Sequence, residues 1–438
     1  MDIPRRITRF TRAAGLVLCV VLAASAHAQQ APAGTTTASV PPLHFTGEVR
    51  VRSELDVQDA LASDLFTYLR TRIGLRVDPA PGAAVFLQLQ DSRVLGTEGN
   101  SASATTDVFD LHQGYVQLSG ESGGHLLALR AGRQEIALGN ERLVGSVNWS
   151  NTGRSFDGVL ATLAPQALGS APAPWTLTAF GAVVDERGRR FGGATPVSGN
   201  ADHSLLGAFL ATAPAASTAD ATLLYDDGMR YRSYADAKRV SLDMHVKRRF
   251  APVRVELEGA IQAGTQHALL ADTTRFTPQD VRAWLVGARV GATVASRGDV
   301  TIGVDALSGD DTPADGTYTA FSTMYATNHA FYGLIDVIGD PAASTKDRGL
   351  VDVFMLGAWR VSDAFTPRAE LHRFSLERSR AGLLASEVDL VAPFRLTSAS
   401  AVELGYSLFR PGASAAAVGL GALGADRQWL YLQLRAGF

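Results

Sequence analysis

The sequence predicts an all-β protein, a single transmembrane antiparallel β-barrel of about 18 strands and of the bacterial outer-membrane type. Three observations predict this fold. A secretory signal opens the chain, apolar and polar residues then alternate along one segment after another, and the links between these segments are short and long in turn. After the signal there is no run of about 18 apolar residues, so a membrane would have to be crossed by strands.

Residues 1–28 have the three parts of a secretory signal peptide. Four arginines precede an apolar run over residues 13–24, and Ala26-His27-Ala28 supplies the small-residue cleavage pattern. The alternative is a retained membrane anchor, but the run is short for a spanning helix. We expect the mature chain to start near Gln29, with a short N-terminal periplasmic segment at 29–42 and the barrel at 43–438. Cys19 lies in the signal, so the mature protein would have no disulfide and no thiolate metal site.

The charge balance excludes one class of partner. Without residues 1–28 the chain has 36 basic and 42 acidic residues, a net charge of about −6. Nucleic-acid-binding proteins usually present a strongly basic face. We therefore expect no nucleic-acid partner.

The strands are predicted by an alternation with a period of two residues, which places charged side chains on one face of a strand. Val49 and Val51, for example, alternate with Arg50 and Arg52. Two segments, 154–164 and 219–226, fit a strand in either orientation. The full set of expected strands is 43–55, 65–77, 83–93, 108–118, 124–137, 154–164, 175–186, 203–213, 219–226, 236–249, 252–264, 281–294, 299–307, 349–360, 365–377, 386–396, 399–410 and 428–438.

The links between the strands also fit a barrel with both termini in the periplasm. Short links follow even-numbered strands, for example at 79–82, 251–252 and 296–298. Longer links follow odd-numbered strands, near 94–107, 138–153, 187–202, 265–280, 308–348 and 411–427. The last strand ends on Phe438 with apolar residues on one face. This ending resembles the assembly signal of outer-membrane barrels, which makes the barrel-assembly machinery an expected partner beside the outer-membrane lipids.

The polar faces of these strands would line a lumen, because a barrel of this size turns its apolar face to lipid. We assign more basic than acidic side chains to this lumen wall, although the mature chain is acidic. An anionic solute would be attracted to such a wall. The alternative is that the charges pair across neighbouring strands to satisfy a polar interior. The basic candidates on the strands are Arg50, Arg52, Arg70, Arg72, Arg76, Arg130, Arg360 and Arg368.

Two loop sequences resemble the alginate-export family of outer-membrane proteins. The first runs from Leu129-Arg130-Ala131-Gly132-Arg133-Gln134-Glu135 through Gly139-Asn140-Glu141-Arg142 to Trp149-Ser150-Asn151-Thr152-Gly153-Arg154-Ser155-Phe156-Asp157-Gly158. The second is Phe321-Ser322-Thr323-Met324-Tyr325-Ala326-Thr327-Asn328-His329-Ala330-Phe331-Tyr332-Gly333, with Asp336 following. The resemblance covers essentially the whole mature chain, and it implies an 18-stranded barrel with an arginine-lined conduit for a polyuronate.

The resemblance also suggests where the pore would be narrowest. Arg133, Arg154 and Asp157 would lie at a constriction, and the alternative is that they form a structural ion pair, above all for Asp157. The loop near 308–348 would either fold inward and offer Tyr325, Asn328, His329 and Tyr332 to a solute, or pack its aromatic residues at the rim. The alginate exporter has a long periplasmic segment between strands 16 and 17, where this chain has only Thr397-Ser398, so the resemblance does not imply periplasmic gating or alginate itself as the solute.

The sequence offers no catalytic or metal-binding motif. The nine histidines are scattered, no His-x-x-x-His pair occurs on a helix, and no Gly-x-Ser-x-Gly elbow is present. Residues 419–424 match a dinucleotide-binding spacing but lack the strand and helix that such a site needs. We expect a channel without cofactor or metal that passes an anionic solute or a polysaccharide such as a polyuronate. The alternatives are an anion-preferring porin for uptake and a barrel enzyme.

Overall fold

The computed structural model describes residues 42–57, 63–95, 108–166, 173–185, 203–213, 216–231, 234–269, 276–312, 315–378, 382–420 and 426–438. The expected signal peptide at 1–28 and nearly all of the expected periplasmic segment at 29–42 lie outside these residues. So do most of the expected long links at 94–107 and 187–202.

Eighteen strands of the described residues form the wall of one closed antiparallel barrel. A further two-residue strand, β14 (Thr317–Tyr318), pairs in parallel with β12 beside the wall. The strands of the wall are β1 (Leu43–Val57), β2 (Ser63–Ala80), β3 (Ala83–Leu95), β4 (Val108–Ser122), β5 (His125–Gln134), β6 (Phe156–Pro165), β7 (Trp175–Asp185), β8 (His203–Thr212), β9 (Ser217–Tyr231), β10 (Tyr234–Phe250), β11 (Val253–Leu269), β12 (Phe276–Val294), β13 (Gly298–Leu307), β15 (Leu350–Trp359), β16 (Arg368–Ser375), β17 (Leu383–Arg395), β18 (Ser400–Pro411) and β19 (Arg427–Gly437).

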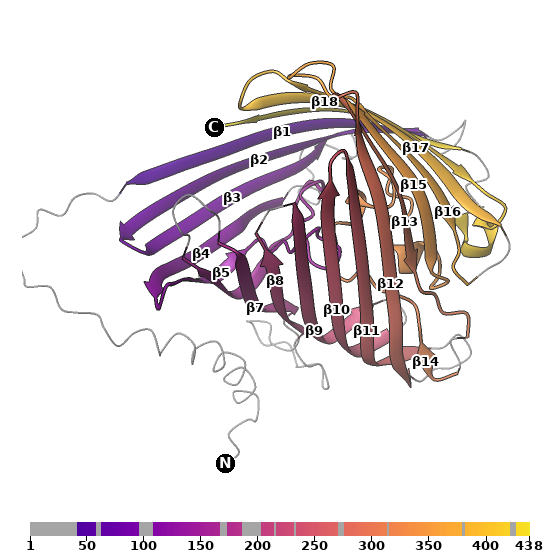
Figure 1. The fold of residues 1–438 in the computed structure, drawn as a ribbon, viewed down its shortest axis with the longest axis horizontal. Helices are drawn as coiled ribbons and strands as arrows, with labels where there is room; N and C mark the ends of the chain where they lie inside the picture. Colours follow the sequence, from indigo (N-terminus) through magenta and orange to yellow (C-terminus); the bar gives the residue numbers. More distant parts are fainter. Residues whose placement is uncertain are drawn as a thin grey trace, which may run out of the picture.

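The barrel closes between the first strand and the last. β1 pairs with both β2 and β19, so that Arg50 lies opposite Arg70 on one side and opposite Arg435 on the other. In Figure 1 the strands follow one another in sequence order, and the indigo β1 lies beside the yellow C-terminal strands. Because every strand has two neighbours, the wall has no open edge that would expose unpaired backbone groups to lipid.

The two faces of the wall differ as the alternation predicts. Apolar side chains on the outward face are largely exposed, for example Ile73 at 55% and Ile261 at 60%. The inward face buries polar side chains such as Arg70 and Gln262. The apolar face therefore suits lipid and the polar face the interior.

The inward face is not polar along its whole length. Towards the ends of the strands that carry the long loops, it bears apolar side chains such as Leu205, Leu224, Leu285 and Phe374, all with less than 1% of their surface exposed. They belong to a core that also contains Phe321 and Tyr332 of a long loop. This explains the two segments that fit either orientation. Residues 156–164 lie in β6 and residues 219–226 lie in β9, and both strands bear apolar residues on both faces because their inner face also packs against buried groups.

Most connections follow the expected alternation, with two corrections. β9 and β10 are separated only by residues 232–233, and the expected long link at 265–280 is largely strand, because β11 extends to Leu269 and β12 begins at Phe276. β17 and β18 are joined by a tight turn at 396–399, in which the backbone N–H of Thr397 donates to the carbonyl of Ser400 over 3.2 Å. Two short helices occur in or beside long loops, α2 (Pro341–Ser344) and the 3-10 turn η2 (Ala415–Val418), together with the 3-10 turn η1 (Asn328–Ala330). In the part of the chain that the structure describes, no helix is long and apolar enough to cross a membrane.

Candidate functional site

Two long loops fold into the barrel and fill its interior near the long-loop end. We call residues 135–155, between β5 and β6, the first inner loop, and residues 308–349, between β13 and β15, the second inner loop. Their bonding partners lie on the inward faces of strands on opposite sides of the wall, including β1, β2, β10, β11 and β17. The second inner loop therefore folds inward, as one of the two alternatives predicted.

The first inner loop is held by arginines of β1 and β2. The guanidinium of Arg50 donates to the carbonyls of Asn148 and Ser150, each over 2.8 Å. Arg70 donates to the same two carbonyls over 3.0 and 3.2 Å, and Arg52 donates to the carbonyl of Trp149 over 2.8 Å. The carbonyl oxygens of one short segment thus offset the mutual repulsion of neighbouring like charges.

Carboxylates complete this arginine cluster. Arg70 pairs with Glu48 at 2.7 Å and Arg52 with Glu54 at 2.6 Å. All four arginines, Arg50, Arg52, Arg70 and Arg72, are at least 90% buried. The arginines therefore bind the loop and these carboxylates. The sequence left two alternatives, a basic lumen wall or charges paired across strands, and both describe this cluster in part, since the arginines face inward and are also paired.

Glu135, the first residue of the first inner loop, connects that loop to β2 and β4. Its carboxylate lies 3.3 Å from Arg72 and 2.7 Å from Nε2 of His112. Burial tends to raise the pKa of Glu135, but the hydrogen bond from His112 and the charges of Arg72 and His112 outweigh it and hold this pKa below its ordinary value. Glu135 is therefore favoured in its charged form.

The second inner loop is anchored on β8 to β11. The hydroxyl of Tyr325 donates to Asp226 over 2.6 Å and lies 2.8 Å from Nε2 of His203. Gln262 donates to the carbonyl of Ser322 over 2.8 Å and accepts the N–H of Ser322 over 3.0 Å. These contacts fix both the side chains and the backbone of this loop against the wall.

The two inner loops are bonded to each other. The backbone of Val144 forms a parallel bridge with Tyr325, and Arg154 donates to the carbonyl of Tyr325. The ring of Trp149 stacks on His329, with 4.4 Å between the ring centroids and 9° between the planes. Asp336 lies 2.9 Å from Nδ1 of the same histidine. The loops therefore form one body rather than two independent flaps.

Arg142 of the first inner loop lies at the junction of this body with the wall. Its guanidinium pairs with Glu258 of β11 at 3.1 Å and with Asp305 of β13 at 2.7 Å, and it donates to the hydroxyl of Tyr332 over 2.8 Å. Burial tends to lower the pKa of Arg142, but the charges of Tyr332, Asp305 and Glu258 more than offset this and the pKa is raised. Arg142 is thus held fully charged in a site that is only 1% exposed.

The structure places the expected loop residues as follows. Tyr325 and Tyr332 are buried and bonded as described, and Asn328 donates to the hydroxyl of Thr323 over 2.9 Å. His329 is partly exposed, at 15% of its side chain. Of these four residues, His329 and Asn328 are the ones that a solute beside the inner loops could reach.

Three expected constriction or pore residues lie elsewhere, and the expectation is corrected for them. Arg133 and Asp157 are cross-strand neighbours on the outward face of β5 and β6 and form an exposed ion pair at 2.8 Å. The structural ion pair considered for Asp157 is therefore present. The reason is parity, because the inward face of β5 is occupied by Arg130 and Gln134. Arg360 follows the end of β15 and lies exposed at the short-turn rim, where it donates to the carbonyl of Ser296 over 3.4 Å.

The remaining expected residues line the short-turn half of the interior. Arg76 pairs with Asp78 at 2.7 Å, and Arg130 donates to Gln117 over 3.1 Å. Arg368 lies 3.4 Å from Glu370. A cavity of about 390 Å³ adjoins Arg76 and Asp78 at the rim. This half of the lumen therefore presents charged groups that the inner loops do not cover.

Several important residues were not among the sequence candidates. Arg142 and Trp149 belong to the first loop sequence, but neither their depth nor their partners on β11, β13 and β19 can be deduced from a loop sequence. The pairs Glu370-x-His372 and Glu387-x-Asp389 could have been noticed, because a spacing of two residues puts each pair on one face of a strand.

The described geometry is that of a closed barrel whose interior is partly filled by an internal loop body. Solved structures with the same fold have been determined from Pseudomonas aeruginosa. OccK8 (OprE) is 12% identical with a TM-score of 0.57, covering 90% of this chain and 98% of its own. OpdO is 12% identical with a TM-score of 0.57, and the alignment covers 90% of this chain and 97% of OpdO. OpdK, solved with vanillate, is 10% identical with a TM-score of 0.55, and the alignment covers 90% of this chain and 98% of OpdK.

Comparison by sequence gives the family. None of the curated proteins matches this chain at a significant level. The family model described as alginate export matches residues 42–386, which is most of the chain and contains β1 to β16. This protein therefore belongs to the alginate export family and forms an 18-stranded channel barrel of the bacterial outer membrane.

Proposed function

We propose that this protein is a gated outer-membrane channel for anionic solutes of the polyuronate type. In this proposal the inner loops restrict the long-loop half of the lumen, and the short-turn half attracts the solute by its charge. No cofactor, metal or bond chemistry is needed for passage. Direction of flow follows the concentration gradient.

The observation that carries the proposal is the set of exposed cations at the short-turn mouth of the lumen. Arg76, Lys247, Arg368 and Arg435 come from β2, β10, β16 and β19, which are distributed around the wall. Their side chains are 40–64% exposed, whereas the carboxylates with which they pair are 17–31% exposed. A solute in the lumen therefore meets the positive ends of these pairs first, and a focused positive potential draws anions.

Polyuronates fit this mouth by their chemistry. Each sugar unit carries one carboxylate, and guanidinium groups bind carboxylates through two parallel hydrogen bonds. Cations placed on separate strands could contact successive sugar units along a chain. Membership of the alginate export family supports the same class of solute.

A second candidate is a channel for small carboxylates. The close packing of the inner loops favours it, because Arg142 and Tyr332 are each only 1% exposed and leave little free space around them. Among the structural neighbours, OpdK was solved with vanillate, which is a small aromatic carboxylate. The two candidates differ in solute length and not in charge.

Planar-bilayer recordings test the proposal. With a KCl gradient across the membrane, we expect a reversal potential that indicates anion preference. Oligouronates of increasing length should then block the current, while neutral maltooligosaccharides of equal length should not. If only monomeric carboxylates enter, the second candidate replaces the polyuronate.

Matched variants connect the selectivity to the mouth. The double variant Arg76→Gln and Arg368→Gln should lose most of the anion preference and weaken oligouronate block by roughly tenfold, an effect of about 1.4 kcal/mol. Arg282→Gln is the control, since Arg282 lies on the outward face and is 74% exposed. Equal effects of the mouth variant and the control would argue against the proposal, and so would a purified folded protein that never conducts.

A further inference from the structure

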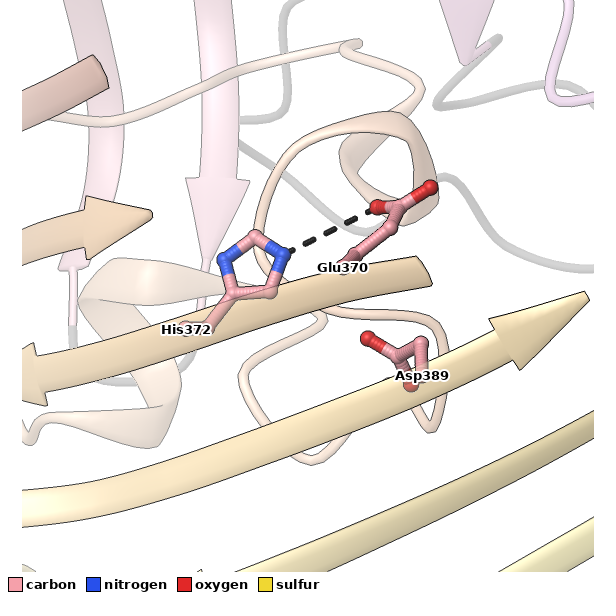
Figure 2. A group of neighbouring side chains, drawn as sticks. All are labelled: Glu370, His372 and Asp389. Carbon is pink, nitrogen blue, oxygen red and sulfur yellow. Dashed lines mark ion pairs between the residues drawn. The ribbon is translucent and has the colours of Figure 1, made fainter. Parts of the chain in front are cut away.

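A second polar cluster lies inside the wall, apart from the mouth cations and the arginine cluster. Glu370 and His372 of β16 and Asp389 of β17 have one ligand atom each within 4.8 Å of one another. Figure 2 shows the two carboxylates turned toward the imidazole, with each side chain rising from the same face of its strand. In the strand register Glu370 lies directly opposite Asp389. Adjacent strands thus present three donor groups to one point.

Two members of this cluster are buried and have potential metal-ligand atoms that form no hydrogen bond. Asp389 is fully buried, and neither of its carboxylate oxygens has a hydrogen-bond partner. Nε2 of His372 makes no hydrogen bond either, its side chain is only 2% exposed, and Oε2 of Glu370 lies 3.8 Å from it. Buried polar atoms almost always have a hydrogen-bond partner in proteins, so several unpartnered ligand atoms that face one point favour a bound ligand there.

The charges indicate the sign of that ligand. Four carboxylates surround the imidazole, those of Asp352, Glu370, Glu387 and Asp389. Within the described residues, the cations in ion pairs with them are His372, when protonated, and Arg368. If all four carboxylates are ionised, four negative and two positive charges leave an excess of two negative charges in a buried place, where uncompensated charge is costly and is removed either by protons or by a bound cation. A divalent cation would balance this excess.

The imidazole is also oriented as in metal sites. Nδ1 of His372 is 2.8 Å from Oδ2 of Asp352, which fixes the ring and leaves Nε2 directed at the cluster. A carboxylate that holds the far nitrogen of a ligating histidine is the usual outer partner in metal sites and makes the histidine more basic.

We propose that Glu370, His372 and Asp389 bind a divalent first-row transition metal, with Zn²⁺ as the best match. One imidazole nitrogen and two carboxylate oxygens form a three-residue ligand set that leaves a fourth position for water. Ca²⁺ and Mg²⁺ prefer oxygen ligands only, so the histidine disfavours them. Bond lengths of about 2.1 Å would bring the three ligand atoms to within about 4 Å of one another, a small contraction of the observed arrangement.

The metal would stiffen the seat of the second inner loop. Glu387, opposite His372 in the register, accepts the N–H of Ile335 over 3.0 Å. It also lies so close to Gly333 that an added Cβ there would be 2.3 Å from its carboxylate oxygen. With the charge of Asp389 taken up by the metal, Glu387 can remain ionised beside it and keep this hydrogen bond. The site thus connects metal binding to the loop body.

The experiment is calorimetric titration of the full mature barrel, without a histidine tag, after treatment with EDTA and desalting. We expect one Zn²⁺ bound per chain, and binding of Ca²⁺ and Mg²⁺ at least tenfold weaker. His372→Gln and Asp389→Asn should each weaken Zn²⁺ binding by at least tenfold. Asp352→Asn, which removes only the outer partner, should weaken it by roughly 10- to 100-fold. X-ray absorption of the zinc-loaded protein should show a shell of nitrogen and oxygen with the scattering of one imidazole.

His245→Gln is the matched control, because His245 is also buried on the inward face with carboxylates at 2.8 and 3.5 Å. It should leave Zn²⁺ binding unchanged. Heat-modifiable migration on gels establishes that each variant is folded. A folded wild-type protein that binds no Zn²⁺ would overturn the site and would mean that Glu387 and Asp389 share a proton instead. Unchanged binding in both ligand variants would overturn it as well. Neither result depends on whether the channel conducts.

Discussion

Single buried charges hold the inner loops in place. Arg142 is the clearest case, because it bonds to two strands and to the other loop from a fully buried position. Its guanidinium also packs on the ring of Phe331, with 3.7 Å from Cζ to the ring centroid. Arg142 thus has four partners on three segments, so substituting it should weaken the attachment of the loop body to the wall more than a change at a residue with a single partner.

We predict that Arg142→Met unlocks the loops while the barrel stays closed. The change removes a positive charge that pairs with the buried carboxylates of Glu258 and Asp305. Breaking a buried ion pair typically lowers the stability of the folded state by about 3–5 kcal/mol. Single-channel recording should show a higher mean conductance and frequent transitions between levels. Arg297→Met, in the turn between β12 and β13, serves as the control. Conductance identical to that of the wild type would exclude Arg142 as the lock.

Glu135 predicts how the channel responds to acid. Its pKa lies below the ordinary value of 4.5, so its ionised form stabilises the folded loop. That contribution is complete above the ordinary pKa and is lost as the pH falls through the lower folded value. Conductance should be constant from about pH 5 to 8 and should rise or become noisy below about pH 4.

The variant Glu135→Gln separates this residue from the other carboxylates. At neutral pH it should already show the noisy conductance that acid causes in the wild type, since Arg72 and His112 lose the same charged partner. A Glu135→Gln channel that is quiet at pH 7 and retains the full acid response would show that other groups cause the effect.

At the scale of elements, neighbouring strands cooperate in holding one loop. Arg50 of β1 and Arg70 of β2 are directly opposite each other and grip the same two carbonyls. Their positive charges would repel in an empty lumen, so the loop carbonyls and Glu48 are what allows them to lie together. The arginines and the loop therefore stabilise one another.

We predict that the pair Arg50→Gln and Arg70→Gln loosens the first inner loop. Each removed charge-assisted hydrogen bond is worth about 1.5–3 kcal/mol. Hydrogen exchange of residues 146–152 should become at least tenfold faster, and conductance should rise. Arg76→Gln is the control on the same face of β2, and it should alter ion selectivity without changing exchange in that loop. Protected amides at 146–152 in the double variant would contradict this.

The second inner loop joins two neighbouring strands of the wall. Leu307 and Leu350 are opposite each other at the ends of β13 and β15, so a short turn can join these strands. We predict that replacing residues 310–348 by a four-residue glycine and serine turn gives a folded barrel. Its single-channel conductance should be at least twice that of the wild type, because the largest body in the lumen is gone. A folded but unchanged channel would mean that the loop does not limit passage.

At the scale of the whole molecule, the closing pair of strands decides whether a barrel forms. The backbone of Phe438 exchanges two hydrogen bonds of 3.0 Å with Gly47, and its ring fills the space over that glycine. A Cβ at Gly47 would lie 2.2 Å from the Phe438 ring. The position of Phe438 against β1 is therefore fixed by these hydrogen bonds and by the contact of its ring with Gly47.

We predict that Phe438→Ala lowers the amount of protein in the outer membrane severalfold, while refolding in detergent remains close to normal. The physical reason is that the Phe438 ring is 82% accessible, so its removal should cost little final stability, whereas an accessible aromatic side chain on the closing strand can be contacted while the barrel is being assembled. Quantified membrane fractions and refolding yields measure the two effects. An equal loss in both would mean that Phe438 acts on stability alone, and Gly47→Val is the comparison for that case.

The strands of the wall can be read from the amino-acid sequence alone. Period-two alternation along each segment, short and long links in turn and the signal-like N-terminus were sufficient to predict 18 strands, nearly all of whose limits agree with the structure within a few residues. These features are local in the chain, since a side chain's face follows from its parity and a hairpin from its link. The segments 154–164 and 219–226 fitted a strand in either orientation because the strands that they form carry apolar residues on both faces.

The contents of the lumen, in contrast, follow from the folded chain and not from the sequence pattern. That Arg50 and Arg70 bind loop carbonyls, that Arg133 and Asp157 face outward, and that Glu370, His372 and Asp389 meet at one point depend on contacts between segments far apart in the chain. Alternation fixes the side of the wall on which a charge lies, but it carries no information on how deeply a loop folds or on which charge it meets. The physical reason is that the partners of a buried charge are chosen by packing in three dimensions, after the barrel has closed.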